Sequence, residues 1–312
     1  MFLIITIIRI RIRNLIKEKE KLEKIVEERT KEVVEQKDEI ARQRDVVTYQ
    51  KKEITDSIQY AETIQLAVLP EVRILKNNFE GYFVLFRPKD IVSGDFYWMS
   101  LKKGHVIFTA ADCTGHGVPG AFMSMLGVSF LNKIVNESGV VRPSEILNDL
   151  RKNIISALKQ KGSFETSKDG MDIAMCSVDK KKMKLWFAGA NNPLFIVRKT
   201  DSGYELIERR GDLMPVGFHS RMDDFTNHEL DIQKGDTIYL FSDGFLDQFG
   251  GPAGRKFMKA NFKQMLLDNQ ALDMASQKDA FNKTLEEWIN YPSEDCLPFG
   301  QVDDIILLGV RI

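Results

Sequence analysis

Aspartates recur at the ends of predicted strands in this 312-residue chain. Acidic residues normally avoid strands, so this placement needs a reason; the residues concerned are Asp95, Asp112, Asp243, Asp303 and Asp304. Clustered carboxylates repel one another and resist ionising together unless cations neutralise them. An all-oxygen ligand set favours magnesium or manganese over zinc. The pattern therefore predicts a site for divalent cations.

The segment that follows Asp112 adds a second chemical feature. Residues 113–116 form a tight turn, and Gly117 and Pro119 lead into an apolar helix in which proline takes a favourable first-turn position. A carboxylate at a strand end, followed by a glycine-rich turn and a helix start, suits a cation and a phosphate. Taken alone, an ordinary strand–helix connection explains this segment equally well.

Several motifs in a fixed order resemble the metal-dependent Ser/Thr protein phosphatases (the PPM family), and in particular their bacterial SpoIIE-type branch (stage II sporulation protein E). The motifs are SGDFYW, ADCTGHGVPGA, MDIAM, FAGANNP, FSDGFLDQFG and VDDIILL, and the resemblance covers roughly residues 54–312. It implies a phosphoprotein phosphatase in which two Mn²⁺ or Mg²⁺ ions activate a water for in-line attack on phosphorus. It also implies a fold of two packed antiparallel sheets with helices outside.

The resemblance assigns metal-binding roles residue by residue. Asp112 matches the carboxylate that bridges both metals, and Cys113 stands where the family offers a backbone carbonyl, so its thiol need not take part. Asp304 occupies a place where the broader family often carries asparagine, and it therefore ranks below its neighbour as a ligand. The remaining acidic ligand positions match Asp95, Asp243 and Asp303.

Four further residues are candidates for a place in or beside the site. His116 lies four residues after Asp112 and could protonate the leaving serine or threonine oxygen, since histidine exchanges protons near neutral pH; a turn-capping histidine is the alternative. Lys89 and Arg87 could hold the substrate phosphate, or they could be solvated surface charges. Asp172 could be a carboxylate at the edge of the site or a turn residue.

Residues 1–69 contain neither glycine nor proline, which predicts one continuous helix. A β-branched heptad column favours a parallel two-stranded coiled coil. That column is apolar except at Lys19 and comprises Ile12, Val26, Val33, Ile40, Val47, Ile54, Ala61 and Val68. The companion column carries glutamines and Arg29, which weaken the seam. We therefore expect a homodimeric signalling helix that can shift register or rotate, with an inert dimerisation rod as the alternative.

Residues 56–70, the end of this helix, carry apolar side chains over a wider face than the seam of a two-helix coiled coil. This segment should therefore also pack on the catalytic domain. It resembles the regulatory helix that precedes the domain in SpoIIE-type phosphatases. Upstream input could move this helix and so set the geometry of the metal site, although packing alone would also explain the pattern.

Residues 1–8 are apolar and are followed by Arg9, Arg11 and Arg13. Eight residues cannot span a bilayer, which needs about 20, and in a secretory signal the positive charges come first. Arginines after an apolar segment are typical of the cytoplasmic end of a transmembrane helix. This predicts either the end of a spanning helix, which would place the protein on the cytoplasmic face of the inner membrane, or the apolar start of a coiled coil.

Composition excludes several other classes of function. A net charge of −1 and a pI near 6.5 give no electrostatic footprint for nucleic acid. Three cysteines without metal-ligand spacing indicate reduced thiols in a cytoplasmic setting. The four histidines are scattered, which disfavours a metal phosphodiesterase for small nucleotides. The matched acids are all present, so an active enzyme is favoured over a catalytically silent module of the same fold that only binds a partner.

The predicted organisation is a juxtamembrane-like start at 1–16, a coiled-coil and regulatory helix at 17–70, and a SpoIIE-type phosphatase domain at 71–312. Hydrophobic patterning predicts an α+β fold. Strands at 82–86, 95–101 and 105–111 should form one antiparallel meander. Further strands are expected at 171–179, 184–189, 194–198, 204–208, 237–241 and 305–311, and helices at 119–136, 144–159, 257–267 and 273–290. The family resemblance suggests a substrate phosphorylated on serine or threonine, carried on a small anti-anti-sigma-type protein.

Overall fold

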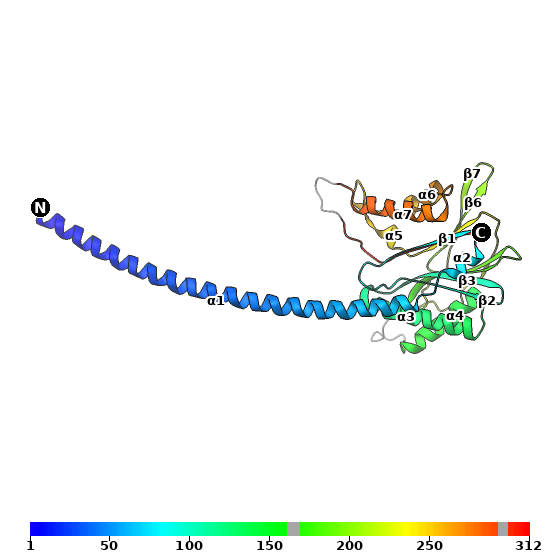
Figure 1. The fold of residues 1–312 in the computed structure, drawn as a ribbon, viewed down its shortest axis with the longest axis horizontal. Helices are drawn as coiled ribbons and strands as arrows, with labels where there is room; N and C mark the ends of the chain where they lie inside the picture. Colours follow the sequence, from blue (N-terminus) through cyan, green and yellow to red (C-terminus); the bar gives the residue numbers. More distant parts are fainter. Residues whose placement is uncertain (161–168, 293–298) are drawn as a thin grey trace. The chain divides into compact units, whose positions relative to one another are not determined.

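The computed structural model describes residues 1–160, 169–292 and 299–312, which divide into two compact units, Met1–Ser57 and Ile58–Ile312 (Figure 1). We call the second unit the domain. It begins inside helix α1 rather than at the predicted boundary after residue 70, because the last turns of the helix pack within it. Cys296 lies outside the described residues.

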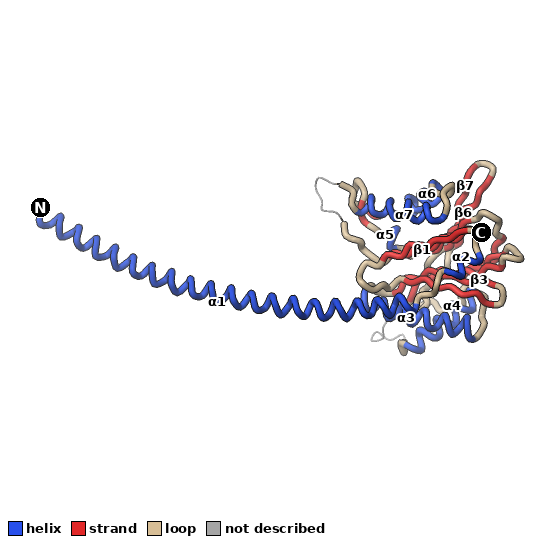
Figure 2. Tube along the Cα trace, viewed as in Figure 1, coloured by secondary structure: helices blue, strands red, loops and turns tan. Residues whose placement is uncertain are grey.

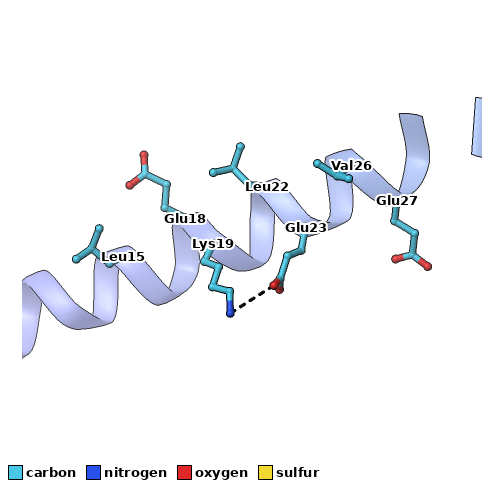
Figure 3. Close-up of a pocket in the computed structure, with 7 residues that line it drawn as sticks. All are labelled: Leu15, Glu18, Lys19, Leu22, Glu23, Val26 and Glu27. Carbon is cyan, nitrogen blue, oxygen red and sulfur yellow. Dashed lines mark ion pairs between the residues drawn. The ribbon is translucent and has the colours of Figure 1, made fainter. Parts of the chain in front are cut away.

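Helix α1 (Phe2–Val68) is continuous, as the absence of glycine and proline predicts. In the first unit its apolar heptad column is exposed to solvent; Ile40, for example, is 66% exposed. Figure 3 shows Leu15, Leu22 and Val26 along one stretch of this helix, beside an ion pair of 3.4 Å between Lys19 Nζ and Glu23 Oε1. The helix therefore presents an apolar stripe bordered by charges.

The domain contains two five-stranded antiparallel sheets that stack face to face (Figure 2). Sheet A has the strand order β1 (Gly81–Arg87), β12 (Ile305–Arg311), β9 (Thr237–Phe241), β6 (Leu194–Thr200) and β7 (Gly203–Arg209). Sheet B has the order β2 (Phe96–Lys102), β3 (His105–Cys113), β4 (Met171–Asp179), β5 (Lys184–Ala190) and β8 (His228–Asp231). A two-stranded ribbon joins β10 (Phe249–Gly250) to β11 (Arg255–Lys256).

Helices cover the outer face of each sheet (Figure 2). Sheet B carries α3 (Gly117–Leu131), its π-helical extension η1 (Asn132–Glu137) and α4 (Pro143–Ala157). Sheet A carries α6 (Met258–Asp268) and α7 (Met274–Ile289), and the short helices are α2 (Arg73–Asn78) and α5 (Gly244–Asp247). Among the described residues only 117–137 have the length and hydropathy of a membrane span, and half of that stretch is buried, as in a core helix.

Burial on both faces explains why the central strands are apolar throughout. In β3, Phe108 and Ala110 point into the core between the sheets, whereas Ile107 and Ala111 point toward the helices. Successive side chains of a strand alternate between its faces, so a strand covered on both sides reads as a continuous apolar run. The run from His105 therefore delivers Asp112 at the end of a buried strand.

The structure confirms the α+β class, the two packed sheets and most element positions, but the expected three-strand meander is wrong. Strands β2 and β3 do form a hairpin, turning at Lys103 and Gly104, whose φ angles of 51° and 80° suit a type I′ turn. Strand β1, however, pairs with β12 at the other end of the chain. The apolar pattern of β1 fixes which face is buried, and it carries no information about a partner so distant in sequence. Sequence reasoning also missed α2, α5, β8 and the β10–β11 ribbon.

Candidate active site and metal-binding acids

A cavity of about 280 Å³ opens where the ends of the two sheets meet. Sheet B contributes Asp112 and Asp172, from the end of β3 and the start of β4, and sheet A contributes Asp243 after β9 and Asp303 before β12. The turn that leads into α3 completes the lining with Cys113, Thr114, Gly115 and His116. Four acids distant in sequence therefore share one cavity.

Strand register explains the proximity of Asp112 and Asp172. The two residues are paired across β3 and β4, and like charges directly opposite each other destabilise a sheet. Asn191 Nδ2 donates a hydrogen bond of 2.8 Å to Asp172 Oδ1, from a left-handed backbone with φ of 55°. Burial raises the pKa of Asp172, and this effect outweighs that of the hydrogen bond, which lowers the pKa. Asp172 is thus a carboxylate of the cavity wall and not a turn residue.

The acids are held in an environment that disfavours their charge. Asp95 is 2% exposed, and burial, followed by repulsion from neighbouring aspartates, raises its pKa well above the usual range, although a hydrogen bond with Ser242 opposes this. Burial and then the charge of Asp95 raise the pKa of Asp112 to about 10. Burial is the largest cause that raises the pKa of Asp243, and repulsion from the charge of Asp247 is the second. Without a cation, Asp112 therefore retains its proton at neutral pH, and Asp95 and Asp243 ionise less readily than free carboxyls.

The donor set fits divalent cations. Asp95 Oδ2 is buried and has no hydrogen-bond partner among the described residues, which leaves a carboxylate oxygen free for another ligand. Among the described residues no three acidic, histidine or cysteine side chains are close enough together to hold a metal ion by themselves, although four aspartates line the same cavity. Magnesium commonly binds through one or two carboxylates and keeps several waters. Oxygen donors that share one acidic cavity therefore match this coordination chemistry.

The two adjacent aspartates before β12 have different surroundings. Asp304 is buried, and its Oδ1 and Oδ2 accept hydrogen bonds of 2.7 Å each from the backbone N–H groups of Lys89 and Gly94. It therefore ties the loop between β1 and β2 to the start of β12. Asp303 lines the cavity. Asp304 thus has a structural role, and the ranking of Asp303 above it as a metal ligand stays a prediction.

The side chain of Cys113 lies in the hydrophobic cluster between sheet B and its helices, where burial raises the pKa of the thiol. Cys113 can therefore offer only backbone atoms to the cavity. The second described cysteine, Cys176, is likewise buried and unbonded. Both thiols are reduced, and neither is placed for nucleophilic chemistry.

Close packing explains the glycines of the turn. Gly115 has φ of 84°, and its carbonyl oxygen would lie 2.2 Å from a Cβ on Gly120 and 2.5 Å from a Cβ on Gly94. Contacts this short leave no room for a side chain at either position. The turn is therefore wedged between the loop that precedes Asp95 and the first turn of α3.

Lys89 and His116 meet at the rim of the cavity, whereas Arg87 does not join them. Lys89 Nζ lies 3.3 Å from His116 Nε2, and His116 Nδ1 lies 2.7 Å from Asp90 Oδ2. Arg87 instead forms an ion pair of 2.6 Å with Glu286 of α7. Sequence reasoning missed Asp90, because nothing in the spacing of these residues links it to His116.

Comparisons with known proteins identify the family and the fold of the chain. The family model of Stage II sporulation protein E (SpoIIE) matches residues 102–312. The SiaA-PP2C domain of Pseudomonas aeruginosa is 34% identical, with a TM-score of 0.72 over 84% of this chain and 98% of that one. The phosphoserine phosphatase RsbU of Bacillus subtilis (strain 168) is 26% identical over 195 residues, 62% of this chain and 54% of RsbU, so the chain spans about half of that relative. The PP2C phosphatase domain of SpoIIE from Bacillus subtilis, 22% identical with a TM-score of 0.54 over 74% of this chain and 62% of that one, shares the fold.

Proposed function

Because the chain belongs to the SpoIIE family of PP2C-type phosphatases, we propose that it hydrolyses phosphoserine or phosphothreonine on a signalling protein. The observation that carries this proposal is the convergence of Asp112, Asp243 and Asp303 from two sheets on one cavity, beside the buried Asp95. Burial makes the charges of Asp95 and Asp112 costly for folding unless cations neutralise them. The motif resemblance matches the same acids to the metal positions of the family.

In this proposal Asp95, Asp112, Asp243 and Asp303 hold two Mn²⁺ or Mg²⁺ ions. Such cations would supply an activated water and would offset the charge on the phosphoryl oxygens. The protein's own groups act at the rim. The ammonium of Lys89 binds a phosphoryl oxygen as a point charge, and His116 delivers a proton to the leaving oxygen of the substrate.

The substrate class rests on the relatives. RsbU is a phosphoserine phosphatase, and we propose an anti-anti-sigma-type phosphoprotein as the partner of this chain. A catalytically silent module of the same fold would bind such a partner and leave its phosphate in place.

Release of phosphate from synthetic phosphopeptides tests the function. We expect phosphoserine and phosphothreonine peptides to be hydrolysed with Mn²⁺ and not with EDTA. Asp243→Asn should lower the rate at least about 100-fold, as expected when a ligand that supports metal catalysis is lost. Asp223→Asn is the matched control, since Asp223 is an exposed acid paired with Arg221. Equal activity in both variants would refute the assignment of the cavity as the active site.

We further propose a homodimer formed through α1. The exposed stripe that a second copy of the helix would cover includes Val26 and Ile40 of the heptad column, together with Leu15 and Leu22 of the companion column (Figure 3). Ile40→Asn should shift the protein toward a monomer in sedimentation experiments, whereas Arg42→Asn, at an exposed position off the column, should not. Residues 1–8 would attach the dimer to the cytoplasmic face of the inner membrane through an upstream spanning helix.

Control by α1 is the last part of the proposal, and Gln65 supports it. Gln65 is 4% exposed, and its side chain both donates to Ser93 O at 2.6 Å and accepts from Ser93 N at 3.1 Å. It also donates to Ser124 Oγ of α3 at 2.8 Å. Ser93 lies two residues before Asp95, so a rotation of the helix end would displace a metal ligand. Input through the coiled coil would in this way reach the cations.

A further inference from the structure

Asp90 contacts His116 across 26 positions of sequence, with 2.7 Å between Asp90 Oδ2 and His116 Nδ1. The contact depends on Gly117, whose φ is 64° and where a Cβ would lie 3.2 Å from Asp90 Oδ2. A side chain at this position would be strained and would crowd the carboxylate. The fold therefore keeps the first residue of α3 small beside the pair.

The hydrogen-bond pattern assigns the protons of the imidazole. A carboxylate can only accept, so His116 Nδ1 carries a hydrogen. An ammonium can only donate, so Nε2, which lies 3.3 Å from Lys89 Nζ, offers its lone pair. Both contacts are satisfied by a neutral ring with its hydrogen on Nδ1. This tautomer leaves Nε2 as the atom that can exchange a proton with a ligand.

We propose that Asp90 is a positioning residue, which fixes the tautomer and the ring plane of His116 for proton delivery to the leaving oxygen. The proposal rests on the proposed phosphatase function and adds a residue to it. A carboxylate that holds Nδ1–H of a catalytic histidine does the same in the Ser-His-Asp triad. Lys89 occupies Nε2 in the free enzyme and leaves it when a substrate phosphate attracts the ammonium.

The proton then follows a balanced path. With Lys89 on the phosphate, His116 takes up a proton from solvent at Nε2. The bond between phosphorus and the substrate oxygen breaks, its electron pair leaves with that oxygen, and the oxygen takes the Nε2 proton. The attacking water gives its hydroxide to phosphorus and its remaining proton to solvent. The products are inorganic phosphate and the free hydroxyl, and the ring returns to its neutral form on Asp90.

A plain surface ion pair is the alternative, since the side chains of His116 and Asp90 are about half exposed, at 51% and 48%. Such pairs contribute little to stability, so Asp90→Asn should fold normally under either interpretation. The two interpretations predict different tautomers of the His116 ring in the Asp90→Asn variant. They also predict a different dependence of its hydrolysis rate on the leaving group of the substrate.

Nitrogen-15 NMR of the imidazoles tests the geometry without any turnover. The chain has four histidines, and His116→Ala assigns the relevant signals by subtraction. We expect the neutral ring of His116 to carry its hydrogen on Nδ1 in the wild type. In Asp90→Asn a mixture of tautomers should appear, and Asp223→Asn should leave the signals unchanged. Hydrogen on Nε2 in the wild type, or the same tautomer in Asp90→Asn, would overturn the proposal.

Hydrolysis of two aryl phosphates with Mn²⁺ tests the chemical consequence. Phenyl phosphate has a poor leaving group that needs a proton, and p-nitrophenyl phosphate has a good one that does not. Asp90→Asn should lower kcat for phenyl phosphate about 10-fold, the lower end of the loss expected when a residue that orients an active-site group is replaced. It should change kcat for the nitrophenyl ester less than about 3-fold, because that leaving group needs no proton.

His116→Ala should show the same selectivity, and the double variant should be no worse than His116→Ala, since the two residues act as one unit. Equal losses on both esters, or additive losses in the double variant, would overturn a positioning role. A wild type that hydrolyses neither ester refutes the proposed function instead, and the NMR result then decides whether Asp90 orients His116.

Discussion

Replacing Asp112 by asparagine should stabilise the metal-free protein. In the folded state burial and the charge of Asp95 raise the pKa of Asp112 from 3.8 to about 10. The folded chain therefore binds this proton more tightly than the unfolded chain does. Its contribution to stability is fully present below about pH 4 and is lost as the pH rises toward 10. At neutral pH the unfolded carboxyl is ionised, and folding must return a proton to it.

The size of this stabilisation follows from the gap between the pKa of Asp112 in the unfolded chain and neutral pH. About 3 pH units separate the unfolded pKa from neutral pH, and each is worth about 1.36 kcal/mol, which sets an upper limit of about 4 kcal/mol on the cost. An asparagine avoids the proton uptake but still buries a polar amide, which costs about 1–3 kcal/mol. We expect a net gain of about 1–2 kcal/mol, or roughly 2–8 °C in Tm for a domain of this size.

Thermal unfolding in EDTA and in Mn²⁺ checks this prediction. Cations at about 100 times their Kd should stabilise the wild type by about 2.7 kcal/mol. Asp112→Asn should gain much less, because it lacks a carboxylate that we propose as a metal ligand. The order of the two Tm values should therefore invert between EDTA and Mn²⁺. The reasoning is refuted if the variant is less stable than the wild type in EDTA, or if both proteins gain equally from Mn²⁺.

Three further predictions follow from the same site. Binding of Mn²⁺ at pH 7 should release protons, since carboxyls with raised pKa values must ionise to bind it; calorimetric heats that do not depend on the buffer would contradict this. Gly120→Ala should destabilise the domain by more than about 2 kcal/mol in urea, because its Cβ would lie 2.2 Å from Gly115 O, while Gly300→Ala, with nothing within 4 Å, should not. Gln65→Ala should change phosphatase activity about 10-fold in either direction, and equal effects from the exposed Gln59→Ala would refute control through this contact.

Local pattern made much of the site predictable. Asp112 and Asp243 each end an apolar run, and a run of that kind identifies a buried strand wherever it occurs in the chain. An acid that follows such a run must then lie where the strands of the sheet end. The long helix was predictable for the same reason, because the absence of glycine and proline in the segment is a local property.

Other features depend on contacts between distant segments. Strand β1 pairs with β12, and nothing in either strand specifies the other as its partner. The pair formed by Asp90 and His116 arises only when the loop before Asp95 packs against the turn into α3. Asp303 and Asp304 are chemically identical neighbours, and only the backbone N–H groups that Asp304 binds distinguish their roles.

The most direct test of the central claim is the rate of p-nitrophenyl phosphate hydrolysis with Mn²⁺, Mg²⁺ or EDTA, for the wild type and for Asp112→Asn. We predict activity that requires a divalent cation and falls at least about 100-fold in the variant. A folded wild type that hydrolyses nothing with either metal, and that stays inactive when residues 1–53 are removed, would contradict the claim and indicate a module that only binds its partner.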